Sequence, residues 1–123
     1  MAAFELIEDR HADYARTEAV SLIVENCWNG GVVVGPPKAV LMASLVGIKG
    51  ELTINGAVVG EGRAEDPCAT LAWLANALAE RGRGLIAGMV VITGSVIPTI
   101  SVAPGDRAVF MVDGLGEAAM EVV

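Results

Sequence analysis

The first candidate for a functional residue is Glu5, a carboxylate within the short apolar run 2–7. Side chains alternate along a strand, so Glu5 should point opposite to Phe4 and Leu6 and to the same side as Ile7. An acid then stands where an apolar residue would fit. Most carboxylates are simply exposed, so Glu5 taken alone favours a solvent-facing side chain on an edge strand.

A second candidate is Thr93-Gly94-Ser95, which closes an apolar run. Its hydroxyls and backbone N–H groups could bind an anionic ligand. They could equally satisfy the backbone of a turn that ends a strand. Glu8, Asp9 and Asp13 form a third polar group, and a charged turn of this kind is usually solvated.

The histidine, the cysteines and the glycine-rich stretch do not form a recognisable catalytic, zinc-binding or nucleotide-binding pattern. His11 is the only histidine, and it lacks the serine or cysteine nucleophile pattern of a catalytic triad. Gly60-Glu61-Gly62 lacks the third glycine and the strand-to-helix context of a nucleotide-binding loop. Cys27 and Cys68 lack the paired spacing of a structural zinc site, and we expect two small buried thiols.

Composition indicates one domain over residues 1–123. A formal charge of -7 with scattered Lys and Arg predicts neither nucleic acid nor an anionic membrane as partner. The uncharged stretch 85–105 is interrupted by glycines and prolines, which favours buried strands over a membrane span. The first residues are too charged for a secretory signal, so we expect a cytoplasmic protein. The 54% hydrophobic content exceeds what a small domain needs, and another subunit could cover the surplus.

The elements that position these residues are mostly strands, which predicts an α+β, β-rich fold. Asn55-Gly56 is a strong hairpin signal, because both residues tolerate the positive φ of a type I′ turn. Asp66-Pro67 predicts a helix start, so the main helix should span about 67–80, after a shorter N-terminal helix within 15–26. Strands are expected at 2–7, 31–34, 51–54, 57–60, 89–93, 96–102, 107–112 and 117–123.

Three stretches resemble the fumarylacetoacetate hydrolase superfamily, in its 2-oxopent-4-enoate hydratase and 4-oxalocrotonate decarboxylase branch. They are 3–10 with Asn26 and Gly30-Gly31 after it, 60–76 with its Trp-Leu-Ala-Asn run, and 84–106 with Gly114-Leu115-Gly116 after it. The first is similar to the family's "ALEIxDSR" strand, and the last to its "GLxAGDVVLTGSxxPxxxVxPGD" pattern. The resemblance covers the family's C-terminal half and implies a mixed β-roll or barrel.

The resemblance also implies a site. Enzymes of the branch hold Mg²⁺ or Mn²⁺ on three carboxylates, and the metal binds a short 2-oxo acid as a Lewis acid. Glu5 stands where the family places its third metal ligand, and the other two belong to an upstream Glu-x-Glu pair. Thr93, Gly94, Ser95 and Asn26 match the substrate-binding turns. No catalytic residue is assigned.

The chain departs from the family at Cys27, Trp28 and Asn29, which replace small residues. Trp28 should either fill part of a pocket or pack against a partner. One carboxylate is a poor magnesium site, so we expect low metal occupancy and weak or no hydratase or decarboxylase activity from this chain alone. The alternative is a non-catalytic oligomerising domain that keeps the fold. Under both hypotheses we expect a homo-oligomer, most simply a dimer, or pairing with an N-terminal half.

Overall fold

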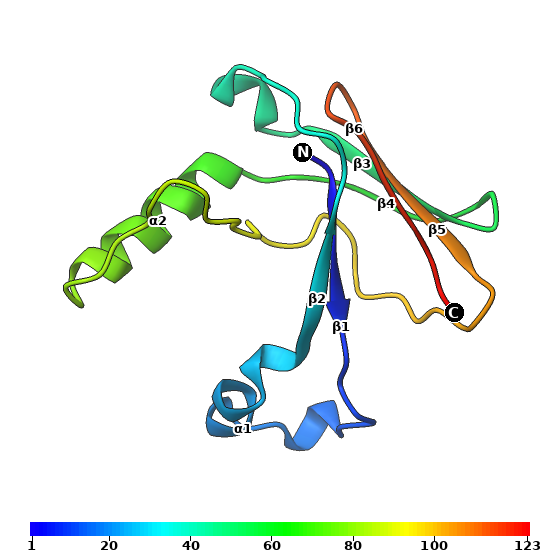
Figure 1. Cartoon of the computed structure of the whole chain (residues 1–123), viewed down its shortest axis with the longest axis horizontal. Helices are drawn as coiled ribbons and strands as arrows, with labels where there is room; N and C mark the ends of the chain where they lie inside the picture. Colours follow the sequence, from blue (N-terminus) through cyan, green and yellow to red (C-terminus); the bar gives the residue numbers. More distant parts are fainter.

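The computed structural model describes residues 1–123, with the backbone alone described at Met42. Within that description no helix has the length and apolar character needed to cross a membrane. Strands outnumber helices, as predicted for an α+β, β-rich chain. Figure 1 shows the strands gathered in one part of the molecule, with helix α2 extending away from them.

The strands form two antiparallel sheets. One is a ribbon of β1 (Ala3–Ile7) and β2 (Asn29–Val34). The other has the order β4-β3-β5-β6 and consists of β3 (Lys49–Ile54), β4 (Ala57–Arg63), β5 (Arg107–Val112) and β6 (Gly116–Glu121). Both sheets are open, so the described chain contains no closed barrel.

The helices begin and end where local chemistry dictates. Helix α2 (Pro67–Ala79) starts at Asp66, whose side chain accepts hydrogen bonds from the N–H groups of Cys68 and Ala69. This confirms the predicted main helix. Helix α1 (Ala19–Val24) covers only part of the predicted range 15–26, and left-handed residues begin at Asn26. Single 3₁₀ turns lie at η1 (Tyr14–Arg16), η2 (Asn26–Trp28) and η3 (Met42–Leu45).

The predicted hairpin forms between β3 and β4. Asn55 and Gly56 have φ angles of 53° and 83°, as a type I′ turn requires. The Asn55 side chain also donates to Asp106 Oδ1 at 2.8 Å and accepts from the Arg107 N–H at 2.9 Å. One turn residue therefore ties this hairpin to the start of β5.

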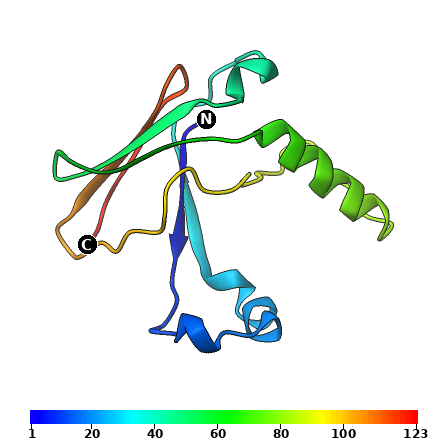
Figure 2. The ribbon, with the colours of Figure 1, turned by 180° about the vertical axis from the view of Figure 1, so that it is seen from behind.

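The segment 84–106 contains no strand, so the predictions of strands at 89–93 and 96–102 were wrong. Pro98 and Pro104 lack N–H donors, and Gly88 and Gly94 have positive φ angles of 92° and 105°. The segment, yellow to orange in Figure 2, passes over β3 and β4 of the four-stranded sheet instead of pairing with a strand edge. Its close approach requires Gly62, where an added Cβ would lie 2.1 Å from the carbonyl oxygen of Val96.

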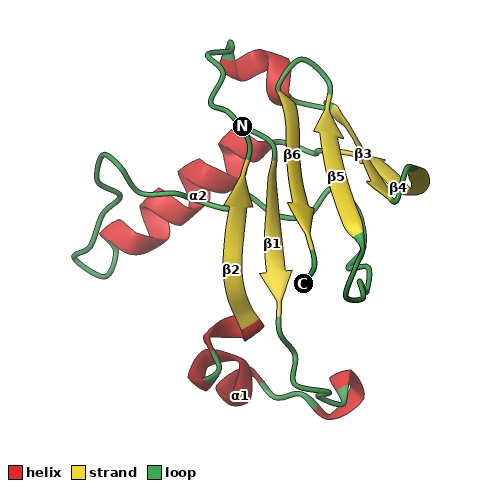
Figure 3. Cartoon of the chain, turned by 45° about the vertical axis from the view of Figure 1, so that its right-hand side comes forward, coloured by secondary structure: helices red, strands yellow, loops and turns green.

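A small core holds the four-stranded sheet to the ribbon. Its buried members are Ala2, Leu52, Ala108, Phe110, Val112 and Ala118. Phe4 of the ribbon packs on Phe110 with ring centroids 6.1 Å apart. Figure 3 shows β1 and β2 running beside β6. Gly35 permits this approach, because a Cβ there would lie 2.1 Å from the carbonyl oxygen of Glu117.

Candidate functional site

Glu5 lies on the face of β1 that points away from the core. Its neighbour Phe4 packs into the core, while the Glu5 side chain is exposed. This is the alternation expected of a strand. Ile7 and Val32 are also exposed, at 38% and 39% of their surface. Glu5 is therefore a carboxylate on an otherwise largely apolar exposed face.

Asn29 orients the Glu5 carboxylate. The amide Nδ2 of Asn29 donates to Glu5 Oε1 at 3.0 Å, across the two strands of the ribbon. Asn29 pairs with Ile7, two residues from Glu5, so both side chains share one face. A register shift between Leu6 and Ile7 aligns this diagonal pair. The sequence alone does not predict this role for Asn29, because cross-strand register cannot be read from one strand.

The described residues do not make a complete metal site. Among them no group of three or more His, Cys, Asp or Glu side chains is arranged to hold an ion. Glu5 offers carboxylate oxygens, but the Asn29 nitrogen beside it is a donor and cannot ligate a cation. Mg²⁺ prefers an octahedron of oxygen ligands, and a single carboxylate such as Glu5 would fill only part of it.

The nearby acids have other partners. Asp9 Oδ2 accepts from the Tyr14 hydroxyl at 2.7 Å and its Oδ1 from the His11 N–H at 3.0 Å. The Tyr14 hydrogen bond lowers the pKa of Asp9 below its usual value and raises the pKa of the tyrosine. Asp13 accepts from the Ala15 N–H at 3.1 Å at the start of η1. These contacts are those of a self-satisfied, exposed turn.

Asn26 lies in a left-handed turn that precedes Asn29. Asn26, Cys27 and Trp28 have φ angles of 52°, 52° and 59°. Such a conformation costs a non-glycine residue about 1 kcal/mol or more. The Asn26 carbonyl accepts the Asn29 N–H, which places Asn26 next to the Glu5–Asn29 pair. Cys27 is exposed, so the expectation that it is a buried thiol was wrong.

Trp28 is buried, but not in the main core. Its ring meets Tyr14 edge-on, with centroids 5.0 Å apart and an interplanar angle of 77°. Its Nε1 donates to Glu25 Oε2 at 2.7 Å. The indole therefore packs on the segment 14–25 rather than in the interior of the sheet.

Thr93, Gly94 and Ser95 lie at a turn of the segment that crosses the sheet. Thr93 is half-buried, Gly94 and Ser95 are exposed, and the Ser95 hydroxyl donates to the carbonyl of Ile97. Gly94 has a φ of 105°. Among the described residues, no recorded hydrogen bond joins this turn to Glu5 or Asn26.

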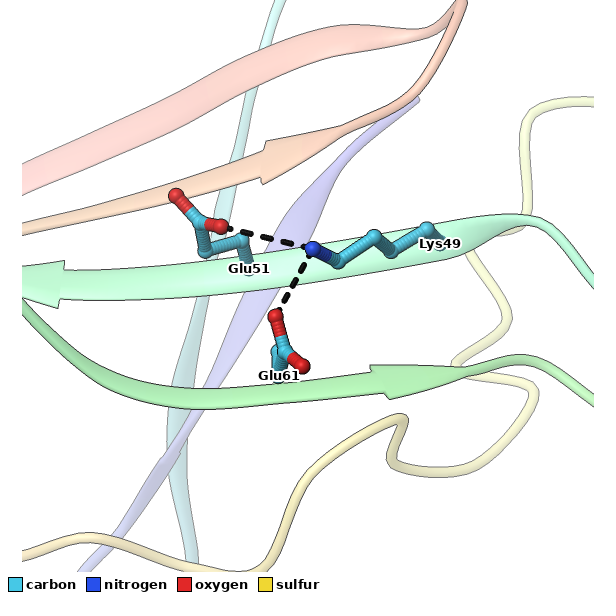
Figure 4. Close-up of polar contacts among 3 residues, drawn as sticks. All are labelled: Lys49, Glu51 and Glu61. Atoms are coloured by element: carbon cyan, nitrogen blue, oxygen red, sulfur yellow. Dashed lines mark ion pairs between the residues drawn. The ribbon is translucent and has the colours of Figure 1, made fainter.

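A charged cluster on β3 and β4 lies apart from these residues. Glu51 and Glu61 are directly opposite each other, a repulsive pairing. The Lys49 ammonium lies between them, 3.6 Å from Glu51 and 2.7 Å from Glu61 (Figure 4). The Glu61 hydrogen bond raises the pKa of Lys49, and Lys49 lowers the pKa of Glu61. The Lys49 ammonium thus neutralises both carboxylates, so Glu51 and Glu61 are poor candidates for metal ligands.

This cluster predicts a pH dependence of stability. The pKa of Glu61 is lowered from 4.5, so its contribution exists above that pH and is lost as pH falls through the folded value. The pKa of Lys49 is raised from 10.5, so its contribution is lost only as pH rises beyond that value. In thermal melts, the melting temperature of wild type should exceed that of Glu61→Gln by a small constant margin from pH 5 to 10. In acid this difference in melting temperature should vanish. Glu51→Gln, which removes the longer contact, should lose less. A margin that persists in acid would contradict this.

The family model for the fumarylacetoacetate (FAA) hydrolase C-terminal domain matches residues 7–123. The match begins just after Glu5 and includes Asn26, Asn29 and Thr93–Ser95. It covers nearly the whole chain, so it identifies the family without reference to the candidate ligand.

Known proteins agree with this match. A 4-oxalocrotonate decarboxylase of Pseudomonas putida is 32% identical over 97% of this chain and 47% of its own length. A 2-keto-4-pentenoate hydratase of Paraburkholderia xenovorans (strain LB400) is 30% identical over 97% of this chain and 46% of its own. The chain thus spans about half the length of the curated relatives it matches.

A solved structure shows the same fold. The 4-oxalocrotonate decarboxylase from Pseudomonas putida G7, complexed with magnesium and adipate, superposes with a TM-score of 0.86 at 28% identity, over 98% of this chain and 48% of that one. The same enzyme complexed with calcium and acetate gives a TM-score of 0.84. Sequence and fold therefore agree that this chain belongs to the fumarylacetoacetate hydrolase family, in its C-terminal domain, with hydratases and decarboxylases as relatives.

Proposed function

We propose that this chain carries one metal ligand and the substrate-facing turns of a divalent-metal hydratase or decarboxylase for 2-oxo-enoic acids. The observation that carries the proposal is Glu5, exposed on the strand face opposite the core and oriented by Asn29. One relative with this fold has been solved both with magnesium and with calcium, which supports a divalent ion such as Mg²⁺ or Mn²⁺.

In this proposal Glu5 binds the cation, and Asn26 with Thr93, Gly94 and Ser95 faces the acid substrate. Support for Asn26 comes from its backbone hydrogen bond to Asn29, one step from Glu5. Support for the other three comes from the family pattern and from their partly exposed position. The remaining metal ligands would be water or the carboxylates of another polypeptide.

A chain of residues 1–123 alone should bind metal weakly and turn over little substrate. With one carboxylate ligand, titration calorimetry with Mg²⁺ or Mn²⁺ should not saturate at about 1 mM. Spectrophotometric assays on 2-hydroxypenta-2,4-dienoate and 4-oxalocrotonate should show marginal activity at most. Any binding that is seen should fall in Glu5→Gln and persist in Glu80→Gln, which removes an exposed carboxylate beyond α2.

Tight metal binding with turnover, both abolished in Glu5→Gln, would refute the prediction of weakness. Other carboxylates of the chain would then have to complete the site. Binding unaffected by Glu5→Gln would refute the assignment of Glu5 itself.

A second function is a non-catalytic oligomerising domain, which the exposed apolar surface favours. The chain exposes 8623 Å². A compact monomer of 12.6 kDa exposes about 6,200 Å², so the excess is roughly 2,400 Å². Helix α2 has no buried residue, and its Trp73 is 70% exposed. An excess of this size is comparable to the surface that stable interfaces bury.

Self-association follows from this surface under both functions. Sedimentation velocity should show a dimer or larger species whose fraction rises with protein concentration, because exposed apolar area is removed from water on association. Sedimentation as a monomer at every accessible concentration would contradict the proposal. A dimer without metal-dependent activity would favour the non-catalytic domain.

A further inference from the structure

The left-handed turn of Asn26, Cys27 and Trp28 contains no glycine, the residue that adopts this conformation without strain. Backbone of this kind persists only where surrounding contacts hold it, and it is concentrated at functional sites. We propose that Trp28 is a positioning residue, whose packed indole holds this turn and thereby sets Asn29 against Glu5. The placing of Asn29 does not require metal, and only its functional meaning rests on the function proposed above.

Two contacts hold the indole. Its Nε1 donates to Glu25 Oε2 at 2.7 Å, and its ring meets Tyr14 edge-on at 5.0 Å. Tyr14 is itself held through its hydroxyl by Asp9 at 2.7 Å. Trp28 is therefore fixed from both sides by the segment between the two ribbon strands.

The backbone carries this constraint to Asn29. The Trp28 carbonyl accepts the N–H of Glu8 at 2.9 Å, which ties the turn to the chain just beyond β1. The next residue, Asn29, begins β2, and its N–H donates to the Asn26 carbonyl. A right-handed or extended turn would redirect the chain at this point, so Asn29 could not keep both this bond and its bond to Glu5.

Trp28 lies outside the main core cluster, so its burial stabilises this turn more than it stabilises the four-stranded sheet. A merely structural tryptophan would stabilise the chain without determining where the Asn29 amide points. The inference therefore predicts an effect on one side-chain amide, separable from an effect on folding.

The test is the Asn29 side-chain amide signal in ¹H–¹⁵N NMR spectra without metal. In wild type it should shift on Glu5→Gln, which identifies the hydrogen bond. In Trp28→Ala it should no longer respond to Glu5→Gln, while the amides of β5 and β6 keep their positions. Trp73→Ala, which removes the exposed tryptophan, should leave the Asn29 signal in place.

Two milder substitutions at Glu25 test the inference if Trp28→Ala does not fold. Glu25→Ala removes the acceptor of the indole but leaves its ring contact, and should weaken the coupling of Asn29 to Glu5. Glu25→Gln keeps an acceptor oxygen and should restore it. An Asn29 signal coupled to Glu5 in every folded variant would overturn the inference. Because no metal is present, that result is distinct from a failure of Glu5 to bind a cation.

Discussion

Replacing Gly35 with alanine should destabilise the chain by about 3 kcal/mol or more, because the new methyl group meets backbone rather than a side chain. The added Cβ would lie 2.1 Å from the Glu117 carbonyl oxygen and 2.9 Å from its carbon. Relief requires β6 or the end of the ribbon to move. The lack of a side chain at Gly35 therefore allows the ribbon that includes Glu5 to lie against the four-stranded sheet.

Gly84→Ala is the matched control, since nothing lies within 4 Å of a Cβ there and no unusual φ is needed. Denaturant unfolding followed by circular dichroism should show a large fall in midpoint for Gly35→Ala and almost none for Gly84→Ala. Equal stability of the two variants would mean that the ribbon does not approach β6 as closely as described.

Phe110→Ala should cost about 3–5 kcal/mol, the usual range for a buried phenylalanine. Phe110 is 9% exposed and packs against Phe4 of the ribbon. Gly50 provides the space for its ring, since a Cβ there would lie 2.7 Å from the ring tip. Only seven buried hydrophobic side chains lie in the part of the chain whose burial is described, so few contacts remain to compensate.

The control for this change is Met111→Ala, the next residue along β5, which is 44% exposed. Its loss should change the free energy of unfolding by less than about 1 kcal/mol. Similar losses at the two positions, measured by the same denaturant titration, would contradict the assignment of the core to one face of β5.

Local chemistry made several elements predictable from sequence. Asn55 and Gly56 occur in the left-handed conformation that their types favour, and the hairpin follows. Asp66 caps the helix that begins at Pro67. Strand β5 covers the predicted residues 107–112, because its apolar run is bounded by turn residues.

Features that depend on distant partners could not be predicted. The segment 84–106 is apolar enough for strands, yet no strand edge pairs with it. The left-handed conformation of Cys27 and Trp28 accompanies a ring contact between Trp28 and Tyr14, which is far from it in the sequence. The Asn29–Glu5 bond depends on a register shift between two strands.

The candidate site was predictable in part for the same reason. Alternation along β1 correctly places Glu5 opposite to Phe4. The other members, Asn26 and the turn 93–95, were proposed from family motifs, and the described contacts connect only Asn26 to the Glu5–Asn29 pair. A single strand pattern identifies a face, whereas a site requires several elements to converge on it.

The most direct test of Glu5 as metal ligand is a titration of the ¹⁵N-labelled chain with Mn²⁺, whose unpaired electrons broaden nearby NMR signals. If Glu5 is the ligand, broadening should begin at the amides of Glu5, Asn29 and Val32, be lost in Glu5→Gln and persist in Glu80→Gln. Broadening that is centred instead on the turn from Asp9 to Asp13, or on Glu51 and Glu61, and that survives Glu5→Gln would contradict that assignment.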